Sequence, residues 1–167
     1  MWNTGRLVDA IATAGLASFL MLSTAEASPT HVSMKVPPKG SGNIHCISVS
    51  NCIAPAPSFG KARIIRWNGR TWKREKVPQP EGLTEINAAA CSSPDHCLAT
   101  GGDGLWVNQF IDEWSEGTWT RSSAPRILAQ GNDIACPSQN NCWIVGERVL
   151  SSLGRGTFAQ HWNGERW

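Results

Sequence analysis

Three pairs of cysteines recur at a constant interval in this chain of 167 residues, and a pair of tryptophans follows each of them. Each cysteine pair encloses five residues and begins 45 residues after the previous one. The cysteine pairs are Cys46/Cys52, Cys91/Cys97 and Cys136/Cys142, and the tryptophan pairs are Trp67/Trp72, Trp114/Trp119 and Trp162/Trp167. A period of this length is typical of repeat proteins, in which one supersecondary unit cannot bury its own apolar face and stacks on its neighbours.

Each period predicts a four-stranded antiparallel meander. In the second period, short apolar segments at 83–91, 97–101, 105–114 and 119–122 are separated by turn-forming residues. Strands spaced in this way indicate hairpins rather than βαβ units, and no helical apolar period follows the first 27 residues. We therefore predict an all-β fold, a β-propeller-like array of about three four-stranded antiparallel blades. Because propellers normally have four to eight blades, three would make an incomplete ring.

The predicted repeat domain spans 28–167, with repeats at about 42–82, 83–127 and 128–167. A further strand is expected at 29–37, because residues 30–37 align with residues 71–78, the fourth strand of the first repeat. The third repeat holds only three predicted strands. Two hypotheses stay open here: a homodimer in which this strand completes a ring between chains, and a partial member of a longer repeat protein.

The first 27 residues predict an export signal. Arg6 precedes an uncharged apolar stretch at 10–23, and Ala25-Glu26-Ala27 has the small-x-small pattern of a cleavage site. An uncleaved amino-terminal anchor is the alternative, although about 14 residues are short for a membrane span of roughly 20. The expected location is extracellular or at the cell envelope, with no stable membrane insertion after cleavage. In that oxidising compartment, an even number of paired cysteines predicts disulfides.

The charge balance argues against nucleic acid as a partner. The chain has 15 basic and 13 acidic side chains, and removal of the predicted signal leaves 14 and 11. No cluster of lysine and arginine forms a phosphate-binding stripe. The expected partner is instead an extracellular ligand, either carbohydrate or protein.

The tryptophan motifs predict hairpin turns. In Trp67-Asn68-Gly69 and Trp162-Asn163-Gly164, asparagine and glycine are expected at positive φ, and the flanking tryptophans would clamp the two strands. In the second motif the glycine is Gly117, one position later, so its turn should differ. The structural motif set is Trp67, Asn68, Gly69, Trp72, Trp114, Gly117, Trp119, Trp162, Asn163, Gly164 and Trp167.

Trp106 and Trp143 lie outside these motifs and are candidate contact residues. The segment 147–156, which varies most among the repeats, is a candidate contact loop. In the first repeat, Pro55 and Pro57 predict a poor central strand and an irregular blade.

A zinc site is an alternative role for the cysteines, since His45 precedes Cys46 and His96 precedes Cys97. The ligand spacing is wider than in Cys-x₂₋₄-Cys knuckles, and the third repeat has Asn141 in place of His96. We expect no metal and no cofactor.

The cysteine and tryptophan motifs together resemble those of secreted bacterial repeat proteins common among actinobacteria. The unit of that family reads Cys-Pro-Ser-x₃-Cys-x-Ala-Val-Gly, followed by Trp-Asn/Asp-Gly-x-x-Trp. Its best match here is the segment 136–146 followed by 162–167. The resemblance implies a β-propeller-like fold and export, and it carries no catalytic residue.

No catalytic constellation is evident in the sequence. A glycosidase needs two carboxylates that face each other across a sugar; Asp95, Asp103, Asp112 and Glu113 are available, but turn chemistry or a solvated strand explains each. The predicted function is a secreted binding or scaffold module. The alternative is a fragment of a propeller-type carbohydrate-active enzyme, either a glycoside hydrolase or sialidase-like.

Overall fold

The computed structural model describes residues 35, 37, 42–56, 60–79, 82, 84–103, 108–123, 127–151 and 154–167. All of them belong to Val32–Trp167, the second of the two units into which the chain divides. The elements of this part are all strands, and among its residues no helix is long and apolar enough to cross a lipid bilayer. The predicted signal peptide, most of the predicted strand at 29–37, and Trp106 lie outside the described residues.

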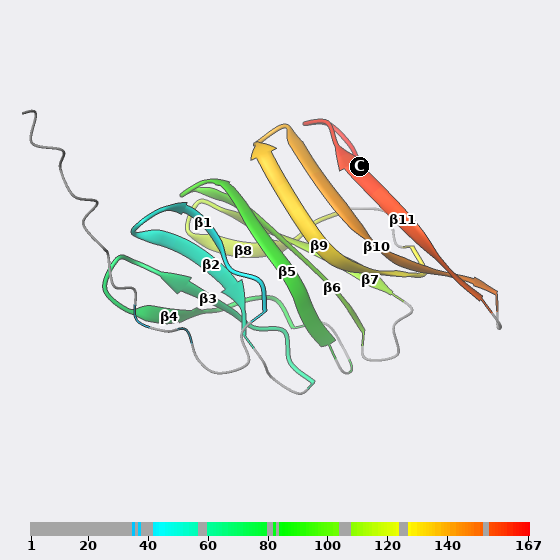
Figure 1. Cartoon of the computed structure of the whole chain (residues 1–167), viewed down its shortest axis with the longest axis horizontal. Coiled ribbons are helices and arrows are strands. Elements are labelled where there is room, and N and C mark those ends of the chain that lie inside the picture. The colour runs from blue at the N-terminus through cyan, green and yellow to red at the C-terminus, as the bar shows by residue number, and fades with distance from the viewer. Residues whose placement is uncertain are drawn as a thin grey trace, which may run out of the picture. The chain divides into compact units, whose positions relative to one another are not determined.

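The strands form three antiparallel sheets in chain order (Figure 1). The first sheet contains β1 (His45–Ser48), β2 (Asn51–Pro55), β3 (Ile64–Trp67) and β4 (Trp72–Glu75). The second sheet contains β5 (Thr84–Ser93), β6 (His96–Asp103), β7 (Gln109–Ser115) and β8 (Thr118–Arg121). The third sheet contains β9 (Ala129–Ser138), β10 (Asn141–Ser151) and β11 (Gly154–Trp162).

This arrangement confirms the all-β, β-propeller-like fold that the sequence predicts. Each sheet is a meander in which every strand pairs with the next strand along the chain. The first two sheets have four strands, and the third has three among the described residues. Within the part of the chain that the structure describes, the sheets form an open array and not a closed ring.

Alternating side chains hold neighbouring sheets together, because successive residues of a strand point to opposite faces. In β6, Ala99 packs toward the first sheet and Leu98 toward the third. The two cores on either side of the second sheet are built from small and branched residues. One contains Ile53, Ile64, Ile86, Ala99 and Phe110, and the other contains Ala88, Ala90, Leu98, Ile111, Ile134 and Ile144.

The tryptophan clamps form as the motifs predict. In each motif the two indole centroids lie 5.7 to 5.8 Å apart, with the rings tilted against each other. In the first two motifs the tryptophans are direct cross-strand partners, at Trp67↔Trp72 and Trp114↔Trp119. Contacts of this kind are a main source of stability in small sheets.

The hairpin turns differ between motifs, which confirms one prediction and corrects another. Glu116 and Gly117 both have positive φ, as in a type I′ turn. In the first and third motifs only Gly69 and Gly164 have positive φ, the pattern of a type II′ turn. The expected positive φ at Asn68 and Asn163 is therefore wrong.

These two asparagines act instead as caps of the turn. The Oδ1 atom of Asn68 accepts hydrogen bonds from the backbone N–H groups of Arg70 and Thr71, at 3.0 and 2.9 Å. Asn163 receives the same pair of bonds from Glu165 and Arg166. This is the local side-chain-to-backbone bonding that makes asparagine common in turns.

The expectation that prolines would spoil the central strand of the first sheet is also wrong. β2 pairs with β1 on one side and with β3 on the other, and Ile53 and Ala54 are fully buried. The strand tolerates Pro55 because this residue is its last one, and the Pro55 carbonyl still accepts a hydrogen bond from the Gly42 N–H at 3.1 Å.

Two glycines mark bulges in the longer sheets. Pairing shifts register between Ile86 and Ala88 in the second sheet, and between Val145 and Gly146 in the third. A Cβ atom at Gly101 would collide with the backbone of Glu85, and one at Gly146 with the backbone of Gln130. Only glycine permits this close approach of two strands.

Candidate functional site

In the first two strands of the second and third sheets, residues 45 positions apart in the sequence occupy equivalent positions, and their partners in the next strand are 48 positions apart. Leu98 pairs with Glu113 across the second sheet, and Trp143 pairs with His161 across the third. Thr100 pairs with Ile111, and Val145 with Ala159. The face of the second sheet that points toward the third sheet can therefore be compared, residue by residue, with the equivalent face of the third sheet.

The face of the second sheet that packs on the third is buried. Ala90 and Thr100 are fully buried, Ile111 is 1% exposed and Leu98 is 4% exposed. Thr100 also lies against Gly131 of β9, where a Cβ atom would meet its side chain. This face is therefore the contact between two blades.

The equivalent face of the third sheet is exposed. We call it the open face and define it by Ala135, Trp143, Val145, Ala159 and His161. All five residues are exposed, and Trp143 and Val145 are 46% and 47% exposed. Exposed large apolar side chains that cluster in this way mark interaction surfaces more often than isolated ones do.

A polar pair recurs at one position of each sheet. In the first sheet Arg66 Nη1 donates to Asn51 Oδ1 at 3.4 Å, and in the second His96 Nε2 lies 3.6 Å from Glu113 Oε1. In the third, His161 Nε2 lies 2.9 Å from Asn141 Oδ1. The register shows that these pairs are equivalent, since Ile53↔Arg66, Leu98↔Glu113 and Trp143↔His161 are matching rows.

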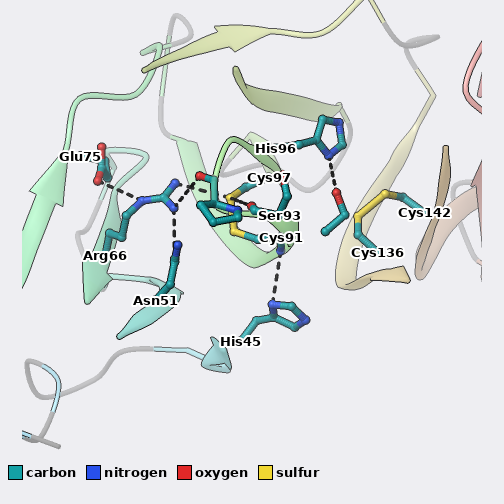
Figure 2. The surroundings of a disulfide bond; sticks show 12 residues. His45, Asn51, Arg66, Glu75, Cys91, Ser93, His96, Cys97, Cys136 and Cys142 are labelled. Carbon is teal, nitrogen blue, oxygen red and sulfur yellow. Dashed lines mark hydrogen bonds and ion pairs between the residues drawn. A yellow bond between two sulfur atoms is a disulfide. The ribbon is translucent and has the colours of Figure 1, made fainter. Parts of the chain in front are cut away.

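In the first sheet, Arg66 of the polar pair also contacts the second sheet. Figure 2 shows Arg66 between Glu75 and Asn51 of its own sheet and the hairpin that carries Cys91–Cys97. Arg66 donates to the Pro94 carbonyl at 3.5 Å and to Cys97 Sγ at 3.4 Å, and its guanidinium lies 4.7 Å from the centroid of the Trp114 ring. A guanidinium can hold several acceptors and an aromatic face at once. Arg66 thus fastens the disulfide end of the second sheet to the first.

A second contact at this junction comes from His45. The backbone N–H of Cys91 donates to His45 Nδ1 at 3.3 Å (Figure 2), so this ring nitrogen carries no proton. Burial lowers the pKa of His45, and the carboxylate of Asp133 partly opposes this effect. The imidazole is therefore held in the neutral form that the hydrogen bond needs.

On the open face the polar pair meets no further sheet within the described residues. The rings of Trp143 and His161 stack, with centroids 4.2 Å apart and planes inclined by 20°. Asn141 Oδ1 accepts from the indole N–H of Trp143 at 3.1 Å as well as from His161. One amide oxygen thus fixes both rings, so an exposed aromatic surface is held in a single orientation.

The acidic residues available for catalysis do not converge. Asp112 is fully buried and paired with Arg121, whose guanidinium lies 4.4 Å from the Phe110 ring centroid. Burial raises the pKa of Asp112, and its hydrogen bond and charge interaction with Arg121 act in the opposite direction. Asp95 lies exposed in the β5–β6 turn, and the side chain of Asp103 lies outside the described residues. Glu113 pairs with His96 on the opposite face of β7 from Asp112. Of the four candidate carboxylates, the three whose side chains are described, on Asp95, Asp112 and Glu113, therefore do not face one another.

The disulfides are confirmed, at Cys46–Cys52, Cys91–Cys97 and Cys136–Cys142. The zinc alternative is wrong for these sulfurs, since a cysteine in a disulfide offers no thiolate. Within the described ranges, no group of three or more histidine, cysteine, aspartate or glutamate side chains could hold a metal ion. The bridges do more than close hairpins, because Cys91, Cys97, Cys136 and Cys142 lie in the cores between sheets.

The predicted contact loop at 147–156 is largely a hairpin. β10 continues to Ser151 and β11 begins at Gly154, with pairs from Glu147↔Thr157 to Ser151↔Gly154. The expectation of a loop is wrong because residues such as Val149 continue the strand pairing. Of the two candidate contact residues, Trp143 is exposed on the open face, and Trp106 lies outside the described residues.

Sequence reasoning missed Arg66, and it named His45, His96, Asn141 and Glu113 without predicting the contact between sheets or the recurring polar pair that they form. The signal was present in the 45-residue spacing, since Asn51, His96 and Asn141 each directly precede the second cysteine of their pair. Their partners Arg66, Glu113 and His161 differ in kind. Only the strand register shows that they are equivalent.

Comparison with known proteins adds one distant likeness. No family model and no curated protein matches the sequence. Among solved structures, the chain is similar to the crystal structure of the GH74 xyloglucanase from Xanthomonas campestris, with 15% sequence identity and a TM-score of 0.48. The match covers 78% of this chain and 25% of the xyloglucanase, so the chain spans about a quarter of that enzyme's length.

Proposed function

We propose that this protein is an extracellular binding and scaffold module whose contact surface is the open face of the third sheet. One observation carries the proposal. The positions that bury Leu98 and Thr100 between the second and third sheets hold Trp143 and Val145 on the open face, where both are about half exposed. A surface built to pack against a β-sheet is thus left without one in the described part of the chain.

The geometry favours a protein partner over a carbohydrate. Where the first sheet packs on the second, Arg66 of the polar pair donates hydrogen bonds to the hairpin that carries Cys91–Cys97. Apolar side chains of the first sheet pack on the second sheet beside this pair. The open face repeats that layout with Asn141, His161 and Trp143. A β-sheet partner would cover the whole row, including Val145 and Ala159, whereas a sugar ring would reach mainly Trp143 and the polar pair beside it.

The extracellular assignment draws support from the disulfides. Three bridges in a chain of this size are typical of proteins that fold in an oxidising compartment. The amino-terminal sequence of the predicted signal supports the same location.

Site-specific photo-crosslinking can test the contact surface. A photoreactive phenylalanine analogue at Val145 should crosslink to a defined extracellular protein, and the same analogue at Val49, an exposed apolar residue in the β1–β2 turn, should not. The crosslinked peptide identifies the partner and its strand.

A glycan array on the same preparation gives the competing outcome. Glycan binding that Trp143→Ala abolishes and Val49→Ala leaves intact would replace the protein partner with a carbohydrate. No crosslink at position 145 and no glycan binding would refute the proposed function.

A further inference from the structure

We infer that Ser92, His96 and Glu113 of the second sheet form a nucleophilic site that takes acyl groups from uncharged carboxylic esters. This inference goes beyond the proposed function and does not depend on the open face. It is drawn from the distances among the three side chains, from the place of Ser92 at a β-bulge and from the contacts that hold its hairpin.

The three side chains form a continuous line of polar contacts. Ser92 Oγ lies 2.8 Å from His96 Nδ1, and His96 Nε2 lies 3.6 Å from Glu113 Oε1. The imidazole therefore has a hydroxyl at one ring nitrogen and a carboxylate at the other. A nucleophile within hydrogen-bond reach of a base, which a third group orients in turn, is the arrangement that activates a serine. It is recognised by geometry and not by the order of the residues in the chain.

The carboxylate favours the protonation that this role requires. Because Glu113 only accepts hydrogen bonds when ionised, it favours a proton on Nε2 of the neutral ring and leaves Nδ1 as the acceptor for the Ser92 hydroxyl. The same negative charge stabilises the imidazolium that forms when the ring takes this proton. The His96 side chain is 7% exposed, whereas Ser92 and Glu113 are partly exposed. The base is thus shielded from bulk water, and the serine still has surface in contact with solvent.

The fold does not require a hydroxyl at position 92. Ser92 is the extra residue of a β-bulge, where the pairing of β5 with β6 shifts register after Cys91. The register shifts at equivalent points of the first and third sheets, where the corresponding residues are Ile47 and Pro137. Isoleucine and proline therefore hold the same bulge. Bulges often re-aim a side chain beside a functional site.

The fold does not require the imidazole either. The residues equivalent to His96 in the other two sheets are Asn51 and Asn141, and an amide cannot take a proton from a hydroxyl. Of the three described sheets, only the second combines a hydroxyl at the bulge with an imidazole and a carboxylate. Since the other two sheets form without this combination, it serves a chemical role.

The hairpin that carries Ser92 is held in place from several sides. The Cys91–Cys97 disulfide closes it, and Arg66 of the first sheet donates both to a backbone carbonyl of the hairpin and to Cys97 Sγ (Figure 2). The backbone N–H of Cys91 donates to His45. A rigid support keeps the nucleophile at a fixed distance from its base, as catalysis by proximity requires.

Local charge indicates the class of substrate. Asp95 lies exposed in the same hairpin, and Glu113 is partly exposed. Two acidic groups near the serine disfavour anionic substrates such as phosphate esters. An uncharged carboxylic ester meets no such repulsion, and its hydrolysis needs only water as a second reactant.

The reaction balances in two steps. Ser92 Oγ attacks the ester carbonyl carbon and gives its proton to His96 Nδ1. The ester C–O bond then breaks, and the imidazolium returns the proton to the leaving alkoxide, which departs as an alcohol. In the second step water attacks the acyl-serine and gives a proton to the imidazole. The carboxylic acid leaves as this proton returns to Ser92 Oγ, and nothing is oxidised or reduced.

Labelling with a neutral alkyl fluorophosphonate tests the inference on the full chain, purified from an oxidising host. The probe should modify Ser92 with loss of fluoride, at a site that peptide mass spectrometry locates. Ser92→Ala should abolish the labelling, and Ser93→Ala in the same hairpin should leave its rate unchanged. His96→Asn installs the residue that the other sheets carry and should slow labelling by about a hundredfold or more.

Near-ultraviolet circular dichroism of the variants verifies their fold. A wild-type protein that is not labelled at Ser92, or a His96→Asn variant that is labelled as fast as the wild type, would overturn the inference.

Two further measurements test the roles of the base and the substrate. Heteronuclear NMR of the neutral His96 ring should find the proton on Nε2. A proton on Nδ1 would contradict the inference, because this nitrogen would then donate to Ser92 Oγ. The wild type should hydrolyse p-nitrophenyl acetate faster than Ser92→Ala does. Equal rates would show that carboxylic esters are not substrates of this serine.

Discussion

The second and third sheets carry equivalent positions with opposite exposure. Leu98 is 4% exposed and Trp143 is 46% exposed, although each lies in the second strand of its sheet, directly after the second cysteine of its pair. Thr100 is fully buried and Val145 is 47% exposed. The strand pattern sets which residues share a face, whereas the next sheet decides whether that face is buried. An apolar face is therefore core in one blade and exposed surface in the other.

The largest expected effect comes from truncating the two matched residues. Leu98→Ala should lower the free energy of unfolding by about 2–5 kcal/mol, because it removes buried methyl groups and leaves a cavity between sheets. Trp143→Ala should cost less than about 1 kcal/mol, since much of the indole is already in water. Urea denaturation of both variants measures the difference. Equal losses would mean that the open face is covered in solution, which sedimentation at the same concentration can check.

The second prediction concerns the disulfides. Each closes a loop of seven residues, so the chain-entropy model assigns about 2.4 kcal/mol to each. Replacing Cys91 and Cys97 together by alanine should cost more than this, because both lie in the core between sheets and Cys97 accepts a contact from Arg66. The matched change at Cys46 and Cys52 should cost less, since Cys46 is exposed. Thermal unfolding of the two double variants would contradict the prediction if the order were reversed.

The third prediction concerns the closeness of the second and third sheets. Gly131→Ala should lower the free energy of unfolding by about 1–3 kcal/mol, because its Cβ atom would collide with the fully buried Thr100, coming within 2.8 Å of Cγ2. Gly102→Ala is the control. Its nearest neighbour would be Gln130 Cγ at 3.6 Å, which is an ordinary contact. Chemical denaturation should therefore separate two glycines that the sequence alone does not distinguish.

The smallest effect is a pH dependence at the first junction. The pKa of His45 lies below its ordinary value of 6.5 in the folded chain, so between these two pKa values the unfolded chain binds a proton that the folded chain does not. The contribution of His45 to the free energy of unfolding should be constant above pH 6.5. It should fall as the pH drops from 6.5 through the lowered pKa of the folded chain. His45→Gln keeps an acceptor for the Cys91 N–H and should remove this part of the slope. An unchanged slope in denaturation curves at pH 5 and pH 7.5 would assign it to another group.

Local features of the fold could be predicted because they depend on residues close in sequence. The hairpin between Cys91 and Cys97 and the clamp between Trp114 and Trp119 are fixed by spacing and alternation. Errors arose where two conformations satisfy one short pattern. Asn68 was expected at positive φ and instead caps the turn through its side chain, and Pro55 was expected to break a strand that it only ends.

The candidate site was less predictable, because its residues come together across sheets. Arg66 contacts the Pro94 carbonyl 28 residues away, and the His45 ring accepts from the Cys91 N–H 46 residues away. Nothing in the local sequence marks these partners. Trp143 was singled out as a contact candidate because it falls outside the tryptophan motifs, and the structure places it at the surface. No local pattern, however, shows that the face around it is exposed while the equivalent face around Leu98 is buried.

The sequence by itself determined the building unit: a 45-residue meander, its disulfide, its tryptophan clamp and the face on which each side chain lies. The tertiary structure decided which of those faces is core and which is surface. The reason is physical, since hairpin geometry depends on bonds within one unit, whereas burial depends on whether another sheet removes that unit from water. Equivalent faces of two sheets are therefore a buried contact between sheets at Leu98 and an exposed surface at Trp143.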